Sequence, residues 1–108
     1  FQIPILEEFL KKLINIKFFQ NFAHKLVPNS YQYKANSKRK YSLNGINMEL
    51  DISDYIPHFI YFQFSDKAQD KLFSVVKPGY IIFDIGANIG YTVLNFARLC
   101  GPEGRVFG

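Results

Sequence analysis

Cysteine is almost absent from this chain of 108 residues, in which Cys100 is the one thiol. A single cysteine cannot close an internal disulfide, so the sequence excludes a small secreted domain held together by disulfides. The two histidines, His24 and His58, lie far apart in the sequence and show no zinc-ligand spacing. We therefore expect no metal site.

Long apolar runs are also lacking. No window approaches the roughly 18 uninterrupted apolar residues of a transmembrane helix, and no signal-peptide pattern opens the chain. The net charge is a modest +4, which permits an acidic partner without requiring one. We expect a cytoplasmic protein without a nucleic-acid partner.

The length is short for a catalytic α/β domain. The chain begins at Phe1 rather than Met and ends at Gly108, directly after the apolar pair Val106-Phe107. We expect an N-terminal piece of a longer protein in three segments: a helical segment and connector (1–37), a β-hairpin with an aromatic stretch (38–64), and the incomplete first βαβ part of a larger domain (65–108).

Residues 4–27 have a helical pattern that ends before Pro28 and is interrupted near Asn15. The apolar residues of the first half follow one helical stripe: Leu6, Phe9, Leu10 and Leu13. Packing on the rest of the protein is one interpretation, and contact of this aromatic, lysine-bearing segment with a membrane surface is the other. Glutamates on the polar face favour packing.

A hairpin is predicted around Asn44-Gly45, because this pair favours a two-residue type I′ turn. The turn pairs apolar Leu43 with Ile46 and Tyr41 with Met48 on one face. On the other face it pairs opposite charges: Lys40 with Glu49 and Lys38 with Asp51. We expect the basic run Lys38-Arg39-Lys40 to be a solvated face rather than a phosphate site.

The stretch from His58 to Phe64 is rich in aromatic residues, and its periodicity leaves a strand and a buried turn as alternatives. His58 is more consistent with a structural or surface residue than with a catalytic acid or base. Ser65 is the expected N-cap of a following helix, which ends at Lys77-Pro78-Gly79.

The last third of the chain predicts a strand, a glycine-rich turn, a helix and a second strand. The continuous apolar run Tyr80–Phe83 is typical of a strand buried on both faces of a parallel sheet. The helix begins at Tyr91 and ends before Gly101, its expected C′ residue, and the second strand begins at Arg105. This order is a right-handed βαβ crossover and indicates the start of a Rossmann-like doubly wound sheet.

The turn between strand and helix has the residues of a ligand site. Gly86 and Gly90 let a ligand approach the backbone, and the first amides of the helix point toward it. Asp84 ends the strand, where open α/β sheets bind ligands. A carboxylate suits an ammonium group and repels a pyrophosphate. A ligand with an ammonium group and a nucleoside, S-adenosylmethionine, therefore fits this turn best.

Two other nucleotide sites fit less well. A dinucleotide fingerprint starting at Gly86 requires glycines where the chain has Asn88 and Tyr91, and no P-loop sequence is present. Among the functions considered, a nucleotide-binding oxidoreductase therefore ranks third.

A non-catalytic interaction or membrane-surface module, made of the N-terminal helix and hairpin, ranks second.

Residues 77–92, and above all the phrase D-x-G-A-N-x-G-Y-T from Asp84 to Thr92, resemble the first motif of FkbM-type methyltransferases. The run Gly101–Phe107 resembles that family's approach to its second strand, and residues 40–74 are compatible with it. Two features depart from the family: Ser65-Asp66 stands where relatives often have Glu, and the chain ends at Gly108, before the family's usual Phe-Glu-Pro.

The resemblance implies a methyltransferase that uses S-adenosylmethionine, commonly for transfer to oxygen, with a small molecule or glycan as acceptor. It implies six cofactor-binding residues, of which Tyr91 lies at the helix start beside the cofactor and five line its methionine end: Asp84, Gly86, Ala87, Asn88 and Gly90. The acidic residue that holds the ribose is expected after Gly108. No catalytic base is assigned, and we expect the 108 residues alone to bind weakly and to be inactive.

Overall fold

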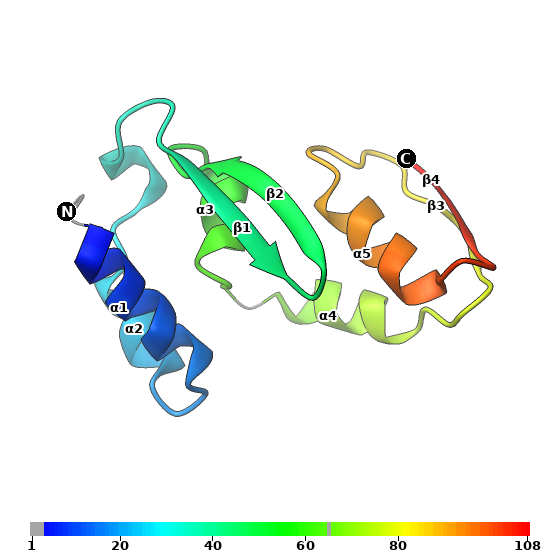
Figure 1. The fold of residues 1–108 in the computed structure, drawn as a ribbon, viewed down its shortest axis with the longest axis horizontal. Helices are drawn as coiled ribbons and strands as arrows, with labels where there is room; N and C mark the ends of the chain where they lie inside the picture. The colour runs from blue at the N-terminus through cyan, green and yellow to red at the C-terminus, as the bar shows by residue number, and fades with distance from the viewer. Residues whose placement is uncertain (1–3, 65) are drawn as a thin grey trace. The chain divides into compact units, whose positions relative to one another are not determined.

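A computed structural model describes residues 4–64 and 66–108, which form a mixed α/β structure (Figure 1). In chain order the elements are α1 (Pro4–Asn15), α2 (Gln20–Leu26), the 3₁₀ turn η1 (Ser30–Gln32), β1 (Lys38–Leu43), β2 (Ile46–Asp51), α3 (Tyr55–Tyr61), α4 (Lys67–Ser74), β3 (Ile81–Phe83), α5 (Tyr91–Cys100) and β4 (Arg105–Phe107). Within this described part each sheet has two strands, β1-β2 and β3-β4, and none of the helices could cross a membrane. The chain divides into two compact units, residues 1–42 with 47–65 and residues 43–46 with 66–108.

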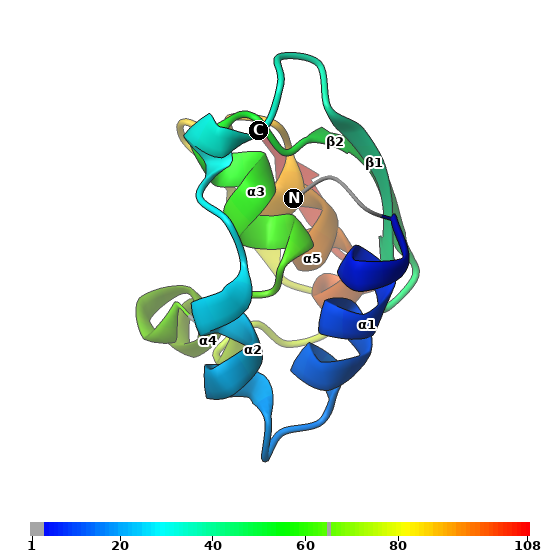
Figure 2. The same cartoon turned by 90° about the vertical axis from the view of Figure 1, so that its left-hand side faces the viewer.

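The first unit begins with a helical hairpin, since the predicted interruption near Asn15 separates α1 from α2 (Figure 2). The buried side of α1 differs from the predicted stripe. Leu10 is buried, but Leu6 and Phe9 are 42% and 55% exposed, while Glu7 is buried. A charged residue occupies the inner face because it has an ionic partner on β1, which an apolar pattern cannot reveal.

The β1-β2 hairpin has the predicted turn. Asn44 and Gly45 have φ values of 53° and 78°, as a type I′ turn requires. The Ile52 amide donates to the Ser37 carbonyl at 3.0 Å, which extends the ladder in the expected register.

The ion pair across the hairpin is diagonal, so the expected partner of Lys38 was wrong. Lys38 Nζ lies 3.3 Å from Glu49 Oε1. Asp51 Oδ1 instead accepts hydrogen bonds from the Ser53 amide at 3.0 Å and the Ser53 hydroxyl at 2.6 Å. This local turn takes the carboxylate away from the strand pairing.

The aromatic stretch is helical as far as Tyr61 and then turns at Phe62 and Gln63, so the strand was wrong and the buried turn holds only for the end of the stretch. Helix α3 tolerates Pro57 because this residue lies in the first turn, where its missing amide would have no helical acceptor. Phe62, the residue directly after the end of α3, is fully buried in the core of the first unit. The other large core residues of that unit are Leu10, Ile14, Tyr33, Tyr41, Leu50, Ile52, Ile60 and Tyr61.

The second unit begins with α4, whose N-cap is Asp66 rather than the expected Ser65, which lies outside the described residues. The Asp66 carboxylate accepts a hydrogen bond from the Gln69 amide at 3.1 Å. Phe73 on α4 packs edge-to-face on Phe96 of α5, with ring centroids 5.4 Å apart. These contacts fix α4 against α5.

Strands β3 and β4 pair in parallel around α5, with Ile82 opposite Val106 and Phe83 opposite Phe107. The predicted order of strand, turn, helix and strand is therefore confirmed. The expected burial of β3 on both faces is not observed: Ile81 and Phe83 are 67% and 70% exposed, while the intervening Ile82 is half-buried. Helix α5 packs against β4, and the face that carries Phe83 and Phe107 remains exposed.

Candidate functional site

The turn between β3 and α5 has an unusual backbone. Gly86, Asn88 and Gly90 have φ values of 80°, 52° and 89°, so three of five consecutive residues are left-handed. Glycine adopts this conformation without steric cost, and asparagine tolerates it better than most residues. The spacing of glycine and asparagine in this segment is thus a requirement of the turn.

Both glycines face open space. A Cβ atom added to Gly86 or Gly90 would meet no heavy atom within 4 Å. Internal packing therefore does not explain the missing side chains, whereas the backbone conformation does. The same openness leaves the backbone of the turn accessible to a ligand.

Asp84 lies at the carboxyl end of β3, half-buried. Its amide donates to the Phe107 carbonyl at 2.7 Å, and its carboxylate oxygen Oδ2 accepts a hydrogen bond from Thr92 Oγ1. Thr92 belongs to the first turn of α5. The carboxylate is therefore held between the strand end and the start of the helix, with one oxygen engaged by the hydroxyl.

Thr92 is the residue of this site that the sequence analysis did not assign. Its signal is a hydroxyl in the first turn of the helix that follows an acidic strand end. Asp84 and Thr92 are only eight positions apart and lie on either side of one turn, so their contact could have been predicted from the sequence. The structure joins the two side chains directly.

Helix α5 begins without a side-chain cap, since Gly90 is its N-cap residue. The positive end of the helix dipole therefore faces the turn without a protein oxygen from the cap. The Tyr91 ring packs edge-to-face on Phe73, with centroids 6.4 Å apart. Tyr91 is one of the six expected cofactor residues. Its side chain is directed to α4, and its backbone begins α5.

Ala87 and Gly108 approach each other closely. A Cβ on Gly108 would lie 3.2 Å from the Ala87 Cβ and 2.5 Å from Val93 Cγ2. The backbone that follows β4 therefore runs directly beside the turn. Asp84, Gly86, Ala87, Asn88 and Gly90 are brought together in a single loop, with the first turn of α5 and Gly108 next to it.

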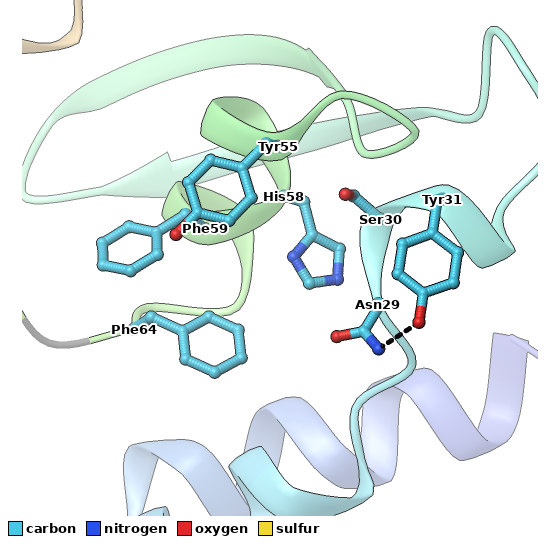
Figure 3. A pocket seen from close by; sticks show the side chains of 7 residues that line it. All are labelled: Asn29, Ser30, Tyr31, Tyr55, His58, Phe59 and Phe64. Carbon is cyan, nitrogen blue, oxygen red and sulfur yellow. Dashed lines mark hydrogen bonds between the residues drawn. The ribbon is translucent and has the colours of Figure 1, made fainter.

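A cavity of about 270 Å³ lies in the first unit (Figure 3). It is lined by Asn29, Ser30, Tyr31, Tyr55, His58, Phe59 and Phe64. His58 is 7% exposed, and its Nε2 lies 2.7 Å from the Pro28 carbonyl oxygen. Burial lowers the pKa of His58 below its ordinary value, and the hydrogen bond to Pro28 opposes that shift in part. The expectation of a structural histidine agrees with these contacts.

The sequence analysis did not assign the cavity, because its residues come from η1, α3 and the segments beside them. Aromatic enrichment at residues 59–64 was visible, but not the ring geometry. Among the described residues, no group of three His, Cys, Asp or Glu side chains could hold a metal ion.

Comparisons with known proteins gave no match, whether the chain was compared with protein-family models, with curated proteins or with solved structures.

Proposed function

We propose that the turn between β3 and α5 binds the methionine end of S-adenosylmethionine, and that the protein is a methyltransferase acting on a hydroxyl of a small molecule or glycan. The observation that carries the proposal is the half-buried Asp84 carboxylate, held by Thr92 at the end of a parallel strand beside an uncapped helix. The resemblance of residues 84–92 to the FkbM-type motif agrees with it. A Rossmann-like continuation of the β3-β4 sheet belongs to the same proposal.

Asp84 suits this cofactor through its charge. S-adenosylmethionine carries an ammonium group and a sulfonium, and a carboxylate attracts both. Its second oxygen remains an acceptor after the hydrogen bond from Thr92, because an ionised carboxylate offers several acceptor positions. The methionine carboxylate would lie toward the start of α5, where the helix dipole is positive.

The left-handed residues have a separate role. Gly86 and Gly90 leave no side chain over the turn, so a ligand can contact backbone groups directly. Asn88 keeps a polar side chain exposed at the same loop. In this proposal the Tyr91 ring, which packs on Phe73 of α4, does not face the cofactor.

For catalysis the protein would mainly align the reactants. The bound cofactor supplies an activated methyl group on a good leaving group. The chain's task is then to hold the acceptor hydroxyl in line and to exclude water. We assign no general base.

A titration tests the proposal. Amide NMR spectra of the chain, recorded with increasing S-adenosylmethionine, should show weak, saturable shifts at Gly86, Asn88 and Gly90. Asp84→Ala should weaken binding tenfold or more, whereas Glu103→Gln, which removes an exposed acidic group of the same unit, should leave it unchanged.

Two results would count against the proposal. Unchanged affinity in Asp84→Ala would remove Asp84 from the site. Saturable shifts of the same amides with a dinucleotide, and none with S-adenosylmethionine, would favour the oxidoreductase interpretation.

A further inference from the structure

The cavity of the first unit has walls made of aromatic rings. Phe59 and Phe64 lie nearly parallel, with centroids 5.6 Å apart and planes 25° from each other. The Phe64 ring is also nearly parallel to His58, at 5.9 Å and 21°. Tyr55 lies one helical turn before Phe59, with its ring 6.2 Å away. Flat faces in similar orientations favour a planar ligand.

The Phe64 ring is held in place by His24, which is not among the residues that line the cavity. His24 stacks on Phe64 at 4.3 Å, and His24 Nε2 lies 2.8 Å from the Phe62 carbonyl oxygen. Phe64 is thus fixed between the α2 side of the unit and the cavity. A wall that is already ordered loses little conformational entropy when a ligand binds.

His58 gives the cavity one directional polar group. Its Nε2 is 2.7 Å from a carbonyl oxygen, which can only accept, so Nε2 carries the proton and Nδ1 is left with a lone pair. The hydrogen bond to Pro28 uses Nε2 and leaves the Nδ1 lone pair as the acceptor of this ring. Figure 3 shows the imidazole between the Phe59 and Phe64 rings on one side and Asn29 and Tyr31 on the other. A ligand here meets an acceptor and must supply the donor.

The mouth of the cavity is polar without charge. Asn29 Nδ2 donates to Tyr31 Oη at 2.9 Å, and Ser30 lies beside them. None of the lining residues is acidic, lysine or arginine. Ionic ligands therefore find no counter-charge. The volume of about 270 Å³ lies slightly below the roughly 300 to 1,000 Å³ typical of drug-sized ligands, which suits a ligand of one or two fused rings.

We propose that this cavity binds a small uncharged aromatic compound that bears a hydroxyl or ring N–H group, with its ring stacked beside Phe59 and Phe64 and its donor on His58 Nδ1. The proposal concerns the first unit alone. It does not depend on cofactor binding by the second unit.

Two matched probes test the donor. 2-Naphthol carries a hydroxyl, and 2-methoxynaphthalene has the same rings without a donor. Titrations of the chain, followed by amide NMR, should give an affinity at least threefold higher for 2-naphthol, with shifts at Ser30, His58 and Phe64. Equal affinities for the two probes would overturn the assigned hydrogen bond.

Variants test the walls. Phe59→Leu should weaken both probes by threefold or more and keep their ratio, whereas Phe18→Leu, which changes a highly exposed ring outside the cavity, should change neither. His58→Phe should abolish the preference for 2-naphthol. If His58→Phe does not fold, the ratio of the affinities for the two probes and the effect of Phe59→Leu still test the proposed site. Equal binding in wild type and Phe59→Leu would refute the site.

Discussion

Arg39 and Glu7 form a two-point ion pair between β1 and α1. Arg39 Nε donates to Glu7 Oε1 at 2.7 Å, and Arg39 Nη2 donates to Oε2 at 3.2 Å. The Tyr61 hydroxyl of α3 donates to the same Oε1 at 3.0 Å. One buried carboxylate therefore connects three elements of the first unit, and it holds the pKa of Arg39 above its ordinary value.

Glu7→Gln should destabilise the first unit by about 2 to 4 kcal/mol, because it leaves the guanidinium and the tyrosine hydroxyl without their charged acceptor. Urea denaturation followed by circular dichroism measures the loss. Glu8→Gln, on the exposed side of the same helix, should change stability by less than about 0.5 kcal/mol. If the double variant Glu7→Leu/Arg39→Met is as unstable as Glu7→Gln, the unpaired charge is not the cause.

The Tyr33 hydroxyl should ionise at a higher pH than an ordinary tyrosine, because its pKa is raised. Burial raises its pKa to about 12, with a further contribution from the charge of Glu7. The folded state thus favours the neutral phenol, so this stabilisation is complete below pH 10 and is lost as the pH rises from 10 to about 12. In an alkaline titration followed by tyrosinate absorbance, Tyr33→Phe should have one tyrosine fewer than the wild type among those that ionise at unusually high pH.

The same substitution tests a buried hydroxyl. Tyr33 Oη has no hydrogen-bond partner among the described residues. Since an unsatisfied buried hydroxyl is costly, Tyr33→Phe should keep or raise the unfolding midpoint in urea at pH 7, by up to about 1 kcal/mol of stability. A loss of more than about 1 kcal/mol would mean that the hydroxyl does have a stabilising partner.

His58 should make the first unit less stable in mild acid. Its pKa in the folded state lies below the ordinary 6.5, mainly because of burial. Unfolded chains therefore bind the proton first as the pH falls, so the stabilisation is complete above pH 6.5 and decreases below it until the folded-state pKa is reached. Urea midpoints between pH 5 and 7 should rise with pH, and His58→Gln should flatten that slope. An equal slope in both proteins would contradict the assignment.

Two glycines of the second unit should respond differently to alanine. At Gly86 the cost is backbone strain alone, about 1 kcal/mol. At Gly104 a Cβ would lie 2.6 Å from both Cys100 Cβ and Sγ and 2.8 Å from the Cys100 carbonyl oxygen, so backbone has to move. Gly104→Ala should therefore cost about 2 to 3 kcal/mol. Thermal unfolding ranks the two variants, and the reverse order would contradict the close approach.

Local chemistry explains what the sequence could predict. The Asn44-Gly45 turn and the glycine spacing from Gly86 to Gly90 are set by φ preferences of individual residues, so both turns follow from the sequence. The order of β3, α5 and β4 follows from the same signals. Methyltransferase function remains a prediction from this motif.

Long-range contacts explain what the sequence could not predict. Glu7 faces the core because Arg39, 32 positions later, meets it there. The cavity depends on His58 reaching the carbonyl of Pro28, 30 positions earlier. Helix α3 was missed because Pro57 and its aromatic neighbours are typical of other structures, and tertiary burial overrides that preference. An apolar run such as β3 likewise does not show which of its faces is covered.

The exposed face of the β3-β4 sheet should affect how the 108-residue chain behaves in solution. Phe83 and Phe107 stack there, 5.1 Å apart and 17° from parallel, in a sheet whose two described strands are both edges. Such a surface attracts further strands and hydrophobic dyes. Solutions of the chain should therefore become turbid at a lower protein concentration than the net charge alone would suggest. Phe83→Lys should raise the concentration at which turbidity appears.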